Sequence, residues 1–418
     1  MDGKSSHPIP IIRKNKVMTS QTDIINQTDR RSTHNYNPLP LVLERGEGVW
    51  VWDTDGNKYL DCLSAYSAVN QGHCHPKIIA AMGEQAQKIT LTSRAFHNDR
   101  MGPFLEKLCQ MAKMDKALPM NTGAEAVETA IKAVRKWGYE VKGVENNKAE
   151  IIVVRDNFHG RTITAVSMSS EAEYRKNFGP FTPGFKLIDY DDLPALEQAI
   201  TPNTVALIME PIQGEAGIII PSDGFLTKAR KICKENNMLF VLDEIQTGLG
   251  RTGKTFCFQH EENAAPDILI VGKALSGGVY PVSAILASDE VMGVFTPGIH
   301  GSTFGGNPLG AAIGLAALKV IEEENLAERS QILGDYLMSK LQNIKTNKIS
   351  EIRGKGLFIG IELDPSLGGA RSYCEALMKR GILCKETHEH VIRLAPPLII
   401  ENEQIDWMVD QIAAVLKD

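Results

Sequence analysis

Five short and almost entirely apolar runs in the middle of the chain constrain its fold more than any other feature. They are IIVV (151–154), VALIME (205–210), MLFVLDE (238–244), DILIVGK (267–273) and VSAILAS (282–288). Segments with helical patterns lie between the runs. Short apolar strands that alternate with helices are typical of a mainly parallel sheet whose two faces are covered by helices. The sequence therefore predicts an α/β fold in which ligands bind beyond the carboxyl ends of the strands.

The rest of the chain is expected to form a second, smaller unit beside this sheet. We predict a flexible tail at residues 1–33 and a large domain at 76–310. Residues 34–75 and the C-terminal residues 311–418 are expected to form a small α/β domain together. Within it, GVWVWDTDGNKYLDCL (48–63) predicts a hairpin with an Asp-Gly turn.

Charge and cysteine content exclude several classes of protein. The 418 residues include 45 basic and 51 acidic side chains, a net charge of −6, and this balance favours neither nucleic acid nor an anionic membrane surface. No apolar run approaches the roughly 18 residues of a membrane helix. Seven scattered cysteines without a C-x-x-C pair suit a reducing compartment. The N-terminus lacks the apolar core of a secretory signal, so we expect a cytoplasmic protein, with an organelle transit peptide as the alternative.

Ionisable residues end three of the apolar runs. Glu210 ends the second run, Asp243 and Glu244 end the third, and Lys273 ends the fourth. A charge at a buried strand end must be paired or take part in chemistry. Lys273 is followed by the small residues ALSGG, which leave room for a bulky group beside its amine. We interpret Lys273 as an amine held for Schiff-base formation; the alternative is a lysine that merely extends into solvent.

A Schiff-base lysine suggests pyridoxal 5'-phosphate as the cofactor. This group also needs an acid beside its pyridine nitrogen and an anion site for its phosphate. Asp243 lies one crossover connection before Lys273 and could face it across the sheet end. NTGAEA, from Asn121, predicts a helix start that presents free N–H groups to an anion. This second signal is weak alone, because T-x-x-E begins many helices.

Two longer motifs resemble a known family. DEIQTGLGRTGK followed by PDILIVGKALSGG is similar to the signature of the class III (subgroup II) aminotransferases, which are pyridoxal-phosphate enzymes of fold type I. NTGAEA, NFHGRT, EPIQGEAG, HGSTFGGNP, RGKGL and IRLAPPL follow in the order of that family. The resemblance extends from about residue 34 to the C-terminal segment. HNYNPLPLVLERGEGV, SAYSAVNQGHCHP, NFGPFTPGF and KALSGGVYPVSA are most similar to the ornithine δ-aminotransferases within the family.

The resemblance implies a cofactor role for each matching residue. Lys273 carries the Schiff base and moves protons, Asp243 pairs with the pyridine nitrogen, and Glu210 belongs to the same catalytic group. The other implied contacts are Gln246 near the ring oxygen, Phe158 stacked on the ring with His159 beside it, and the backbone N–H groups of Gly123 and Ala124 on the phosphate. Ser302 and Thr303 are implied to complete the phosphate site of a partner subunit, so the resemblance predicts at least a homodimer.

The resemblance also implies the substrates L-ornithine and 2-oxoglutarate. Arg161 and Arg393 match positions that grip carboxylates, although each could instead form a structural ion pair. Glu215 matches a residue that masks Arg393 while the δ-amine reacts, and Tyr36 and Tyr66 match residues around ornithine. The implied products are glutamate and glutamate 5-semialdehyde, which cyclises to pyrroline-5-carboxylate. N-acetylornithine and 4-aminobutyrate are the alternative donors.

Several other short motifs lack the sequence context that their usual functions need. GLGRTGKT (248–255) fits the nucleotide loop G-x-x-x-x-G-K-[ST], but IQT separates it from its strand and no helical pattern follows. GHCHP (72–76) lacks a second ligand cluster, so we expect a helix-start loop and no metal, and HEHV (388–391) is expected to be a solvated turn. RGKGL (353–357) does not make a dinucleotide site. A nicotinamide dehydrogenase and a cofactor-free binding protein are the alternatives from other functional classes.

Overall fold

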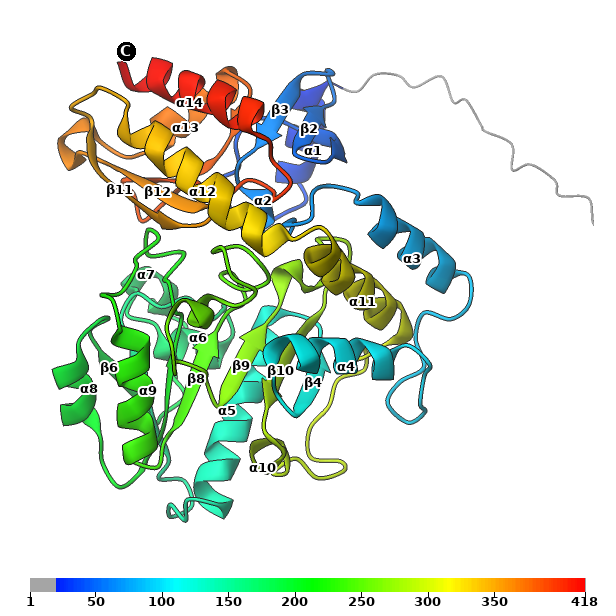
Figure 1. The fold of residues 1–418 in the computed structure, drawn as a ribbon, viewed down its shortest axis with the longest axis vertical. Helices are drawn as coiled ribbons and strands as arrows, with labels where there is room; N and C mark the ends of the chain where they lie inside the picture. Colours follow the sequence, from blue (N-terminus) through cyan, green and yellow to red (C-terminus); the bar gives the residue numbers. More distant parts are fainter. Residues whose placement is uncertain (1–19, 418) are drawn as a thin grey trace, which may run out of the picture.

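A mainly parallel sheet forms the centre of the larger part of the molecule (Figure 1). The computed structural model describes residues 20–417, so the first part of the predicted tail, residues 1–19, lies outside the described residues. Within this range the sheet has seven strands in the order β4-β10-β9-β8-β7-β5-β6. Only β10 runs antiparallel to its neighbours β4 and β9. The strands are β4 (Lys116–Met120), β5 (Glu150–Val154), β6 (Phe185–Ile188), β7 (Thr204–Met209), β8 (Leu239–Asp243), β9 (Ile268–Val271) and β10 (Ser283–Ala287).

Helices cover both faces of this sheet, which explains why its strands lack polar alternation. Every residue of β7 and β8 is buried. In β8, Phe240 and Leu242 join the core cluster that contains helix α9 (Phe225–Glu235), whereas Leu239 and Val241 join the cluster that contains α5 (Gly123–Glu140). Successive side chains of a strand point to opposite faces, so apolar residues are needed at every position. The predicted α/β class is confirmed.

Two four-stranded sheets make up the smaller part. Their orders are β1-β2-β3-β13 and β11-β12-β15-β14. N-terminal and C-terminal segments meet in the first sheet, where Leu60 of β3 pairs in parallel with Ile382 of β13. The predicted hairpin is present, because β2 and β3 pair antiparallel around Gly56. The strands are β1 (Leu43–Glu47), β2 (Trp50–Asp53), β3 (Lys58–Asp61), β11 (Ile349–Lys355), β12 (Phe358–Leu363), β13 (Ile382–Leu383), β14 (Lys385–Thr387) and β15 (Val391–Leu394).

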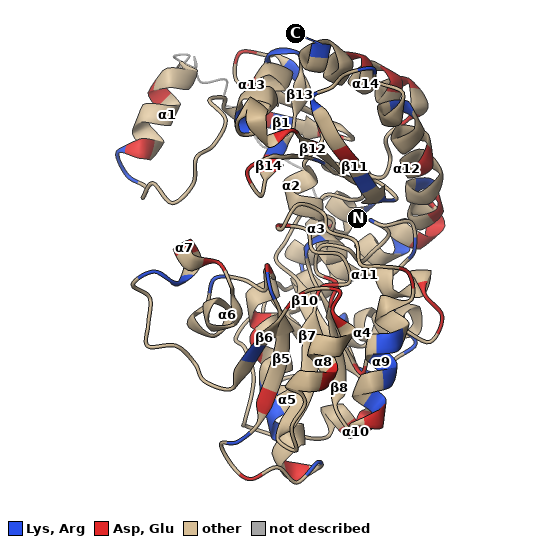
Figure 2. Ribbon diagram, turned by 90° about the vertical axis from the view of Figure 1, so that its left-hand side faces the viewer, with Lys and Arg blue, Asp and Glu red and all other residues tan. Residues whose placement is uncertain are grey.

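Part of the predicted flexible tail is helical. Residues Gln21–Asp29 form α1, which Figure 2 shows set apart from the sheets. The Ser20 hydroxyl accepts a hydrogen bond from the Asp23 N–H at 3.1 Å, and the Asp23 carboxylate accepts one from the Ser20 N–H at 3.3 Å. This reciprocal cap satisfies donors that a helix start otherwise leaves free. Gln21 also accepts from the Val42 N–H at 2.8 Å, so α1 is tied to the smaller part.

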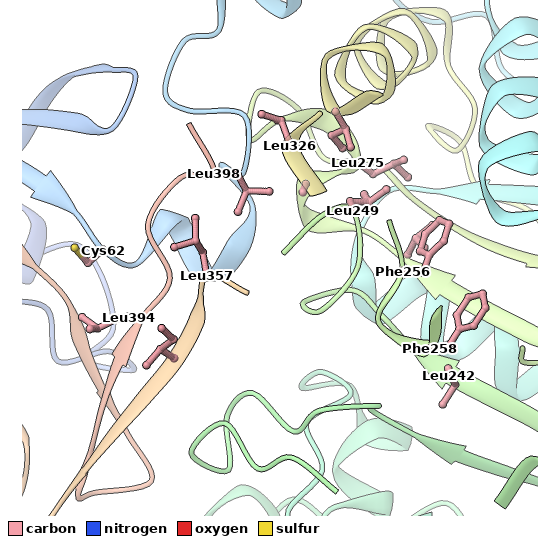
Figure 3. Packing of buried hydrophobic residues seen from close by; sticks show 14 of the residues in the cluster. Cys62, Leu242, Leu249, Phe256, Phe258, Leu275, Leu326, Leu357, Leu394 and Leu398 are labelled. Carbon is pink, nitrogen blue, oxygen red and sulfur yellow. The ribbon is translucent and has the colours of Figure 1, made fainter. Parts of the chain in front are cut away.

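Apolar packing continues from one part into the other. Figure 3 shows Leu326, Leu357 and Leu398 of the smaller part on one side and Leu249 and Leu275 of the larger part on the other, and all five belong to one buried cluster. The domain boundaries stay a prediction. No helix within residues 20–417 has the length and apolar character needed to span a membrane. The remaining helices are α2 (Ser64–Ser67), α3 (Pro76–Ala86), α4 (Met101–Ala112), α6 (Ile163–Met168), α7 (Ala172–Arg175), α8 (Leu193–Ala199), α10 (Asp289–Met292), α11 (Pro308–Glu323), α12 (Leu326–Gln342), α13 (Arg371–Lys379) and α14 (Asn402–Lys417), with 3-10 turns η1 (Cys257–His260), η2 (Lys273–Ser276) and η3 (Pro365–Leu367).

Candidate active site

A cavity of about 210 Å³ lies beyond the carboxyl ends of β7, β8 and β9. Parallel strands end at the same edge of a sheet, so the ionisable residues that follow them converge there. The structure brings together eight of the residues expected from the sequence: Gly123, Ala124, Phe158, His159, Glu210, Asp243, Gln246 and Lys273. The lining also includes Gly160, Ile245 and Thr247, which sequence reasoning missed. The only signal for them was their position next to predicted site residues.

Lys273 enters this cavity from a constrained piece of backbone. It stands two residues beyond β9 with a φ of 45°, a left-handed conformation that is uncommon for residues other than glycine. No hydrogen bond or ion pair to the rest of residues 20–417 is formed by its amine. Burial lowers the pKa of Lys273, and the negative charges of Glu215 and Asp243 offset only part of this effect. The environment therefore shifts the amine toward its neutral, nucleophilic form.

Asp243 is held by a buried histidine. The His159 Nδ1 lies 2.8 Å from the Asp243 Oδ2, and both side chains are almost completely excluded from solvent. The Ile245 N–H donates to the other carboxylate oxygen at 3.1 Å. Burial opposes protonation of His159, but the hydrogen bond and charge of Asp243 outweigh it and raise the pKa of His159. The His159 Nε2 is buried without a partner in residues 20–417. The site therefore holds a fixed carboxylate next to an incompletely satisfied polar ring.

Glu210 fixes the segment that carries the aromatic wall of the cavity. Its carboxylate accepts hydrogen bonds from the N–H groups of Phe158 at 3.0 Å and Gly214 at 3.4 Å. Burial raises the pKa of Glu210 to about 7, with a further contribution from the nearby Asp243. The Phe158 ring meets Tyr174 edge to face, with 6.4 Å between the ring centroids. Glu210 thus acts on the position of Phe158 and titrates near neutral pH.

The start of α5 offers an anion site to the same cavity. The Thr122 hydroxyl accepts from the Glu125 N–H at 3.2 Å, and the Glu125 carboxylate accepts from the Thr122 N–H at 2.8 Å. Gly123 and Ala124 line the cavity, and N–H groups in the first turn of a helix have no intrahelical acceptor. A Cβ at Gly123 would lie 2.9 Å from the Cδ1 of Ile245, so a side chain there would have to displace the end of Ile245. Free N–H groups and the helix dipole together favour a phosphate.

A buried ion pair closes the other side of the site. The Arg393 Nη1 lies 2.6 Å from the Glu215 Oε1, and Arg393 is only 1% exposed. Gln246 bridges the pair, because it donates to Glu215 at 3.2 Å and accepts from Arg393 at 3.3 Å. Burial disfavours the charge of Glu215, but Arg393 outweighs it and lowers the pKa of Glu215 to about 2. The Arg393 guanidinium also lies 5.0 Å from the ring centroid of Tyr66.

Seven expected site residues do not line this cavity. Two of them, Glu215 and Arg393, form the ion pair described above, and the other five are Tyr36, Tyr66, Arg161, Ser302 and Thr303. Arg161 is exposed, and its guanidinium stacks 3.6 Å from the Tyr174 ring centroid. Tyr36 is 73% exposed and lines a separate cavity of about 410 Å³ together with Tyr66. The Ser302 hydroxyl accepts from the Asn121 side chain at 2.8 Å, and the exposed Thr303 follows it. None of these five residues lines the cavity that contains Lys273.

The histidines of the GHCHP motif bind carboxylates of their own chain. His73 contacts Asp61 at 2.7 Å, and His75 contacts Glu324 at 3.2 Å. Within residues 20–417 no group of three or more His, Cys, Asp and Glu side chains is arranged to hold a metal ion. The nucleotide-like loop is followed by turns and the short η1 instead of an α-helix, and its Lys254 is exposed.

An amine without a protein partner, a buried carboxylate and a helix start face one another at the strand ends, as in fold type I enzymes that use pyridoxal 5'-phosphate. Residues 31–416 match the family model "Aminotransferase class-III". The chain belongs to the class III aminotransferases.

Individual relatives are similar over almost the whole chain. The ornithine aminotransferase of Geobacillus sp. (strain WCH70) is 60% identical over 398 residues, which cover 95% of this chain and 99% of the relative. The crystal structure of the ornithine aminotransferase from Toxoplasma gondii ME49 gives a TM-score of 0.94 at 44% identity and covers 96% of this chain and 95% of that chain. An acetylornithine aminotransferase from Elizabethkingia anophelis gives a TM-score of 0.86 at 47% identity, covering 96% of this chain and 99% of that chain.

Class III aminotransferases use pyridoxal 5'-phosphate, and the residues of the cavity fit this group. The unpaired Lys273 amine would form the covalent link, and Asp243 would face the pyridine nitrogen. Gly123 and Ala124 at the start of α5 would hold the phosphate. The individual roles of these residues stay a prediction.

Proposed function

We propose that this chain transfers the δ-amino group of L-ornithine to 2-oxoglutarate. The products are glutamate and glutamate 5-semialdehyde, which cyclises to pyrroline-5-carboxylate. The observation that carries the proposal is the Glu215–Arg393 pair, which neutralises the buried cation beside the cavity. The high identity to proteins named ornithine aminotransferase supports the same substrate.

Lys273 is proposed as the group that moves protons. When bound, pyridoxal phosphate supplies an electron sink for the substrate carbon that carries the amino group. Burial lowers the pKa of Lys273 and so shifts its amine toward the neutral form. When the Lys273 Nζ is not bonded to the cofactor, it can accept a proton from that carbon. Asp243 would face the ring nitrogen, and His159 holds its carboxylate in place at 2.8 Å.

The Glu215–Arg393 pair allows one site to accept two kinds of substrate. While Glu215 holds Arg393, no buried cation attracts the α-carboxylate of ornithine, and the δ-amine enters instead. Glutamate and 2-oxoglutarate displace Glu215 and take Arg393 by two parallel hydrogen bonds. Arg161, which has only aromatic contacts in residues 20–417, is proposed to hold their distal carboxylate. Tyr66, which lies against Arg393, and Tyr36 are proposed to meet the α-end of ornithine.

N-acetylornithine is the alternative donor, because an acetylornithine aminotransferase is also structurally similar. The test is a panel of ornithine, N-acetylornithine, lysine and 4-aminobutyrate with 2-oxoglutarate as acceptor. We expect the highest kcat/KM for ornithine, with pyrroline-5-carboxylate identified chemically as the product. A clear preference for another donor would overturn the substrate and leave the family unchanged.

We also propose that two copies of the chain form the working enzyme. The support is that Ser302 and Thr303 match residues expected at a partner's phosphate site and do not line the cavity of their own chain. Analytical ultracentrifugation should show a dimer or a larger assembly, and a monomer with full activity would contradict the proposal. The cytoplasmic location stays a prediction.

A further inference from the structure

Arg251, in the middle of the nucleotide-like loop, is a completely buried arginine with a relative exposure of 0%. No carboxylate within residues 20–417 forms an ion pair with it. Its Nη1 donates to the carbonyl oxygens of Leu357 at 2.8 Å and Pro396 at 2.6 Å, and its Nη2 donates to the Asn70 side chain at 2.5 Å. Burying a guanidinium without a counter-charge is costly, so its contacts call for a physical explanation.

Three of the segments that meet at Arg251 carry a residue of the Glu215–Arg393 pair or one that contacts it. Pro396 follows Arg393 by three residues at the end of β15. Asn70 follows Tyr66, whose ring lies against the Arg393 guanidinium, by four residues. Gln246, which bridges the ion pair, precedes Arg251 by five residues in its own loop. One side chain therefore connects three segments beside the ion pair, and the segment of Glu215 itself is not among them.

The hydrogen bonds of Arg251 also fix the two neighbouring strands that support Arg393. Leu357 lies directly before β12, and β12 pairs with β15 so that Gly360 is opposite Arg393. The guanidinium thus ties the beginning of one strand to the end of the other. Asn70 adds two hydrogen bonds between the same segments. Its side-chain amide donates to the Leu249 carbonyl at 3.1 Å, and its backbone carbonyl accepts from the Leu398 N–H at 2.8 Å.

We propose that Arg251 is a positioning residue that keeps Arg393 paired with Glu215 while ornithine reacts, by fixing the segments that carry Gln246, Arg393 and Tyr66. The proposal rests on the proposed function and names a determinant of its substrate discrimination. A planar fork of five donors is needed to bind three oxygens in different directions. Lysine keeps the charge but offers a single compact donor group, so Arg251→Lys separates positioning from charge.

The test compares the two half-reactions of the cofactor-loaded Arg251→Lys enzyme. We expect the ratio of kcat/KM for ornithine to kcat/KM for glutamate to fall by about tenfold or more. The expected cause is a lower KM for glutamate, because Arg393 is more easily released, together with a higher KM for ornithine. A purely structural lesion lowers both half-reactions in proportion and leaves the ratio unchanged.

Arg329→Lys is the matched control. Its guanidinium also donates to carbonyl oxygens just beyond β15, those of Leu398 at 3.4 Å and Ile400 at 3.0 Å, but it does not reach the segments of Gln246 or Tyr66. We expect the ratio of the control to equal that of the wild type. If the control shifts the ratio as much as Arg251→Lys, the special role of Arg251 is refuted.

If Arg251→Lys does not fold, Asn70→Ala is the second test variant. It removes one hydrogen-bond acceptor of Arg251 and leaves Arg251 in place. It should shift the ratio in the same direction by a smaller factor. A crystal structure of either variant should show Arg393 displaced from Glu215. An unchanged ratio in a folded variant, or an intact 2.6 Å pair, overturns the proposal. A wild-type enzyme that does not use ornithine would instead overturn the proposed function, so the two failures are distinguishable.

Discussion

The Glu215–Arg393 pair makes a quantitative prediction about substrate choice. Glu215→Gln keeps the shape of the side chain and removes the charge that faces Arg393 at 2.6 Å. Arg393 is 1% exposed and the Glu215 side chain is 26% exposed, so water can replace only part of the lost carboxylate charge. The variant should therefore bind an α-carboxylate at Arg393 without first breaking an internal ion pair.

The size of the effect follows from the pKa of Glu215. Its carboxyl group has an ordinary value of 4.5 and is lowered to about 2, so the folded site stabilises the charged form by about 3 kcal/mol. The shift combines the cost of burial with contributions from Arg393, Lys273 and Gln246, so it gives only the order of magnitude of the free energy that a substrate carboxylate must overcome to displace Glu215. Removing it should raise kcat/KM for glutamate by up to about a hundredfold. For ornithine we expect a fall, because Arg393 captures its α-carboxylate and turns the δ-amine away from Lys273.

The assay measures each half-reaction with the cofactor-loaded enzyme and identifies the product formed from ornithine. We expect kcat/KM to rise for glutamate and to fall for ornithine. Part of the ornithine should be transaminated at its α-carbon. Glu401→Gln is the control, because it removes an exposed carboxylate 2.9 Å from Arg329. It should change kcat/KM for neither glutamate nor ornithine. Equal changes for both substrates with unaltered product would refute the masking role of Glu215.

Three further changes test other parts of the structure. Lys273→Ala should abolish turnover and the covalent attachment of cofactor after borohydride reduction, measured by mass spectrometry, whereas Lys254→Ala in the nucleotide-like loop should retain both. Ala65, at φ 47° and ψ 49°, should accept glycine with a gain of about 1 kcal/mol in the free energy of unfolding. Ala68→Gly, at a right-handed position with φ −84°, should lose stability. Both free energies of unfolding are measured by urea titration. A loss of stability in both variants would contradict the backbone strain at Ala65. Because the folded pKa of Glu215 is depressed, its contribution to stability is complete above about pH 4.5 and is lost as the pH falls toward about 2. The free energy of unfolding of Glu215→Gln should therefore vary less than that of the wild type across this window, and parallel curves would contradict the depressed pKa.

Sequence reasoning found the reacting edge of the sheet because a parallel sheet leaves little choice. A run of apolar residues that ends in Glu210, Asp243 or Lys273 fixes where the chain leaves the core. The carboxyl ends of neighbouring parallel strands share one edge, so the side chains meet in one cavity without any information about loops.

Features that depend on contacts between distant segments could not be predicted in this way. Residues 64–67 form a turn in which four successive residues have positive φ, although none of them is glycine. Asp61 stabilises this turn by accepting from the N–H groups of Leu63 and Ser64, each at 2.9 Å, and His73 holds Asp61 at 2.7 Å. Local propensity opposes such a turn, so only the tertiary contacts determine it. The helix α1 differs, because its S-x-x-D cap, from Ser20 to Asp23, is visible in the sequence alone.

The nucleotide-like loop shows why a short motif can match without its usual ligand. Its glycines are required by backbone geometry: Gly250 and Gly253 have φ of 94° and 97°, and a Cβ at Gly253 would lie 2.4 Å from Gln331. A phosphate loop needs glycines for the same reason, since its backbone turns tightly and approaches other atoms closely. The pattern therefore reports the shape of the backbone, and the side chains decide what the loop holds. In this chain the loop directs Arg251 inward, where its guanidinium binds three oxygens of the protein itself.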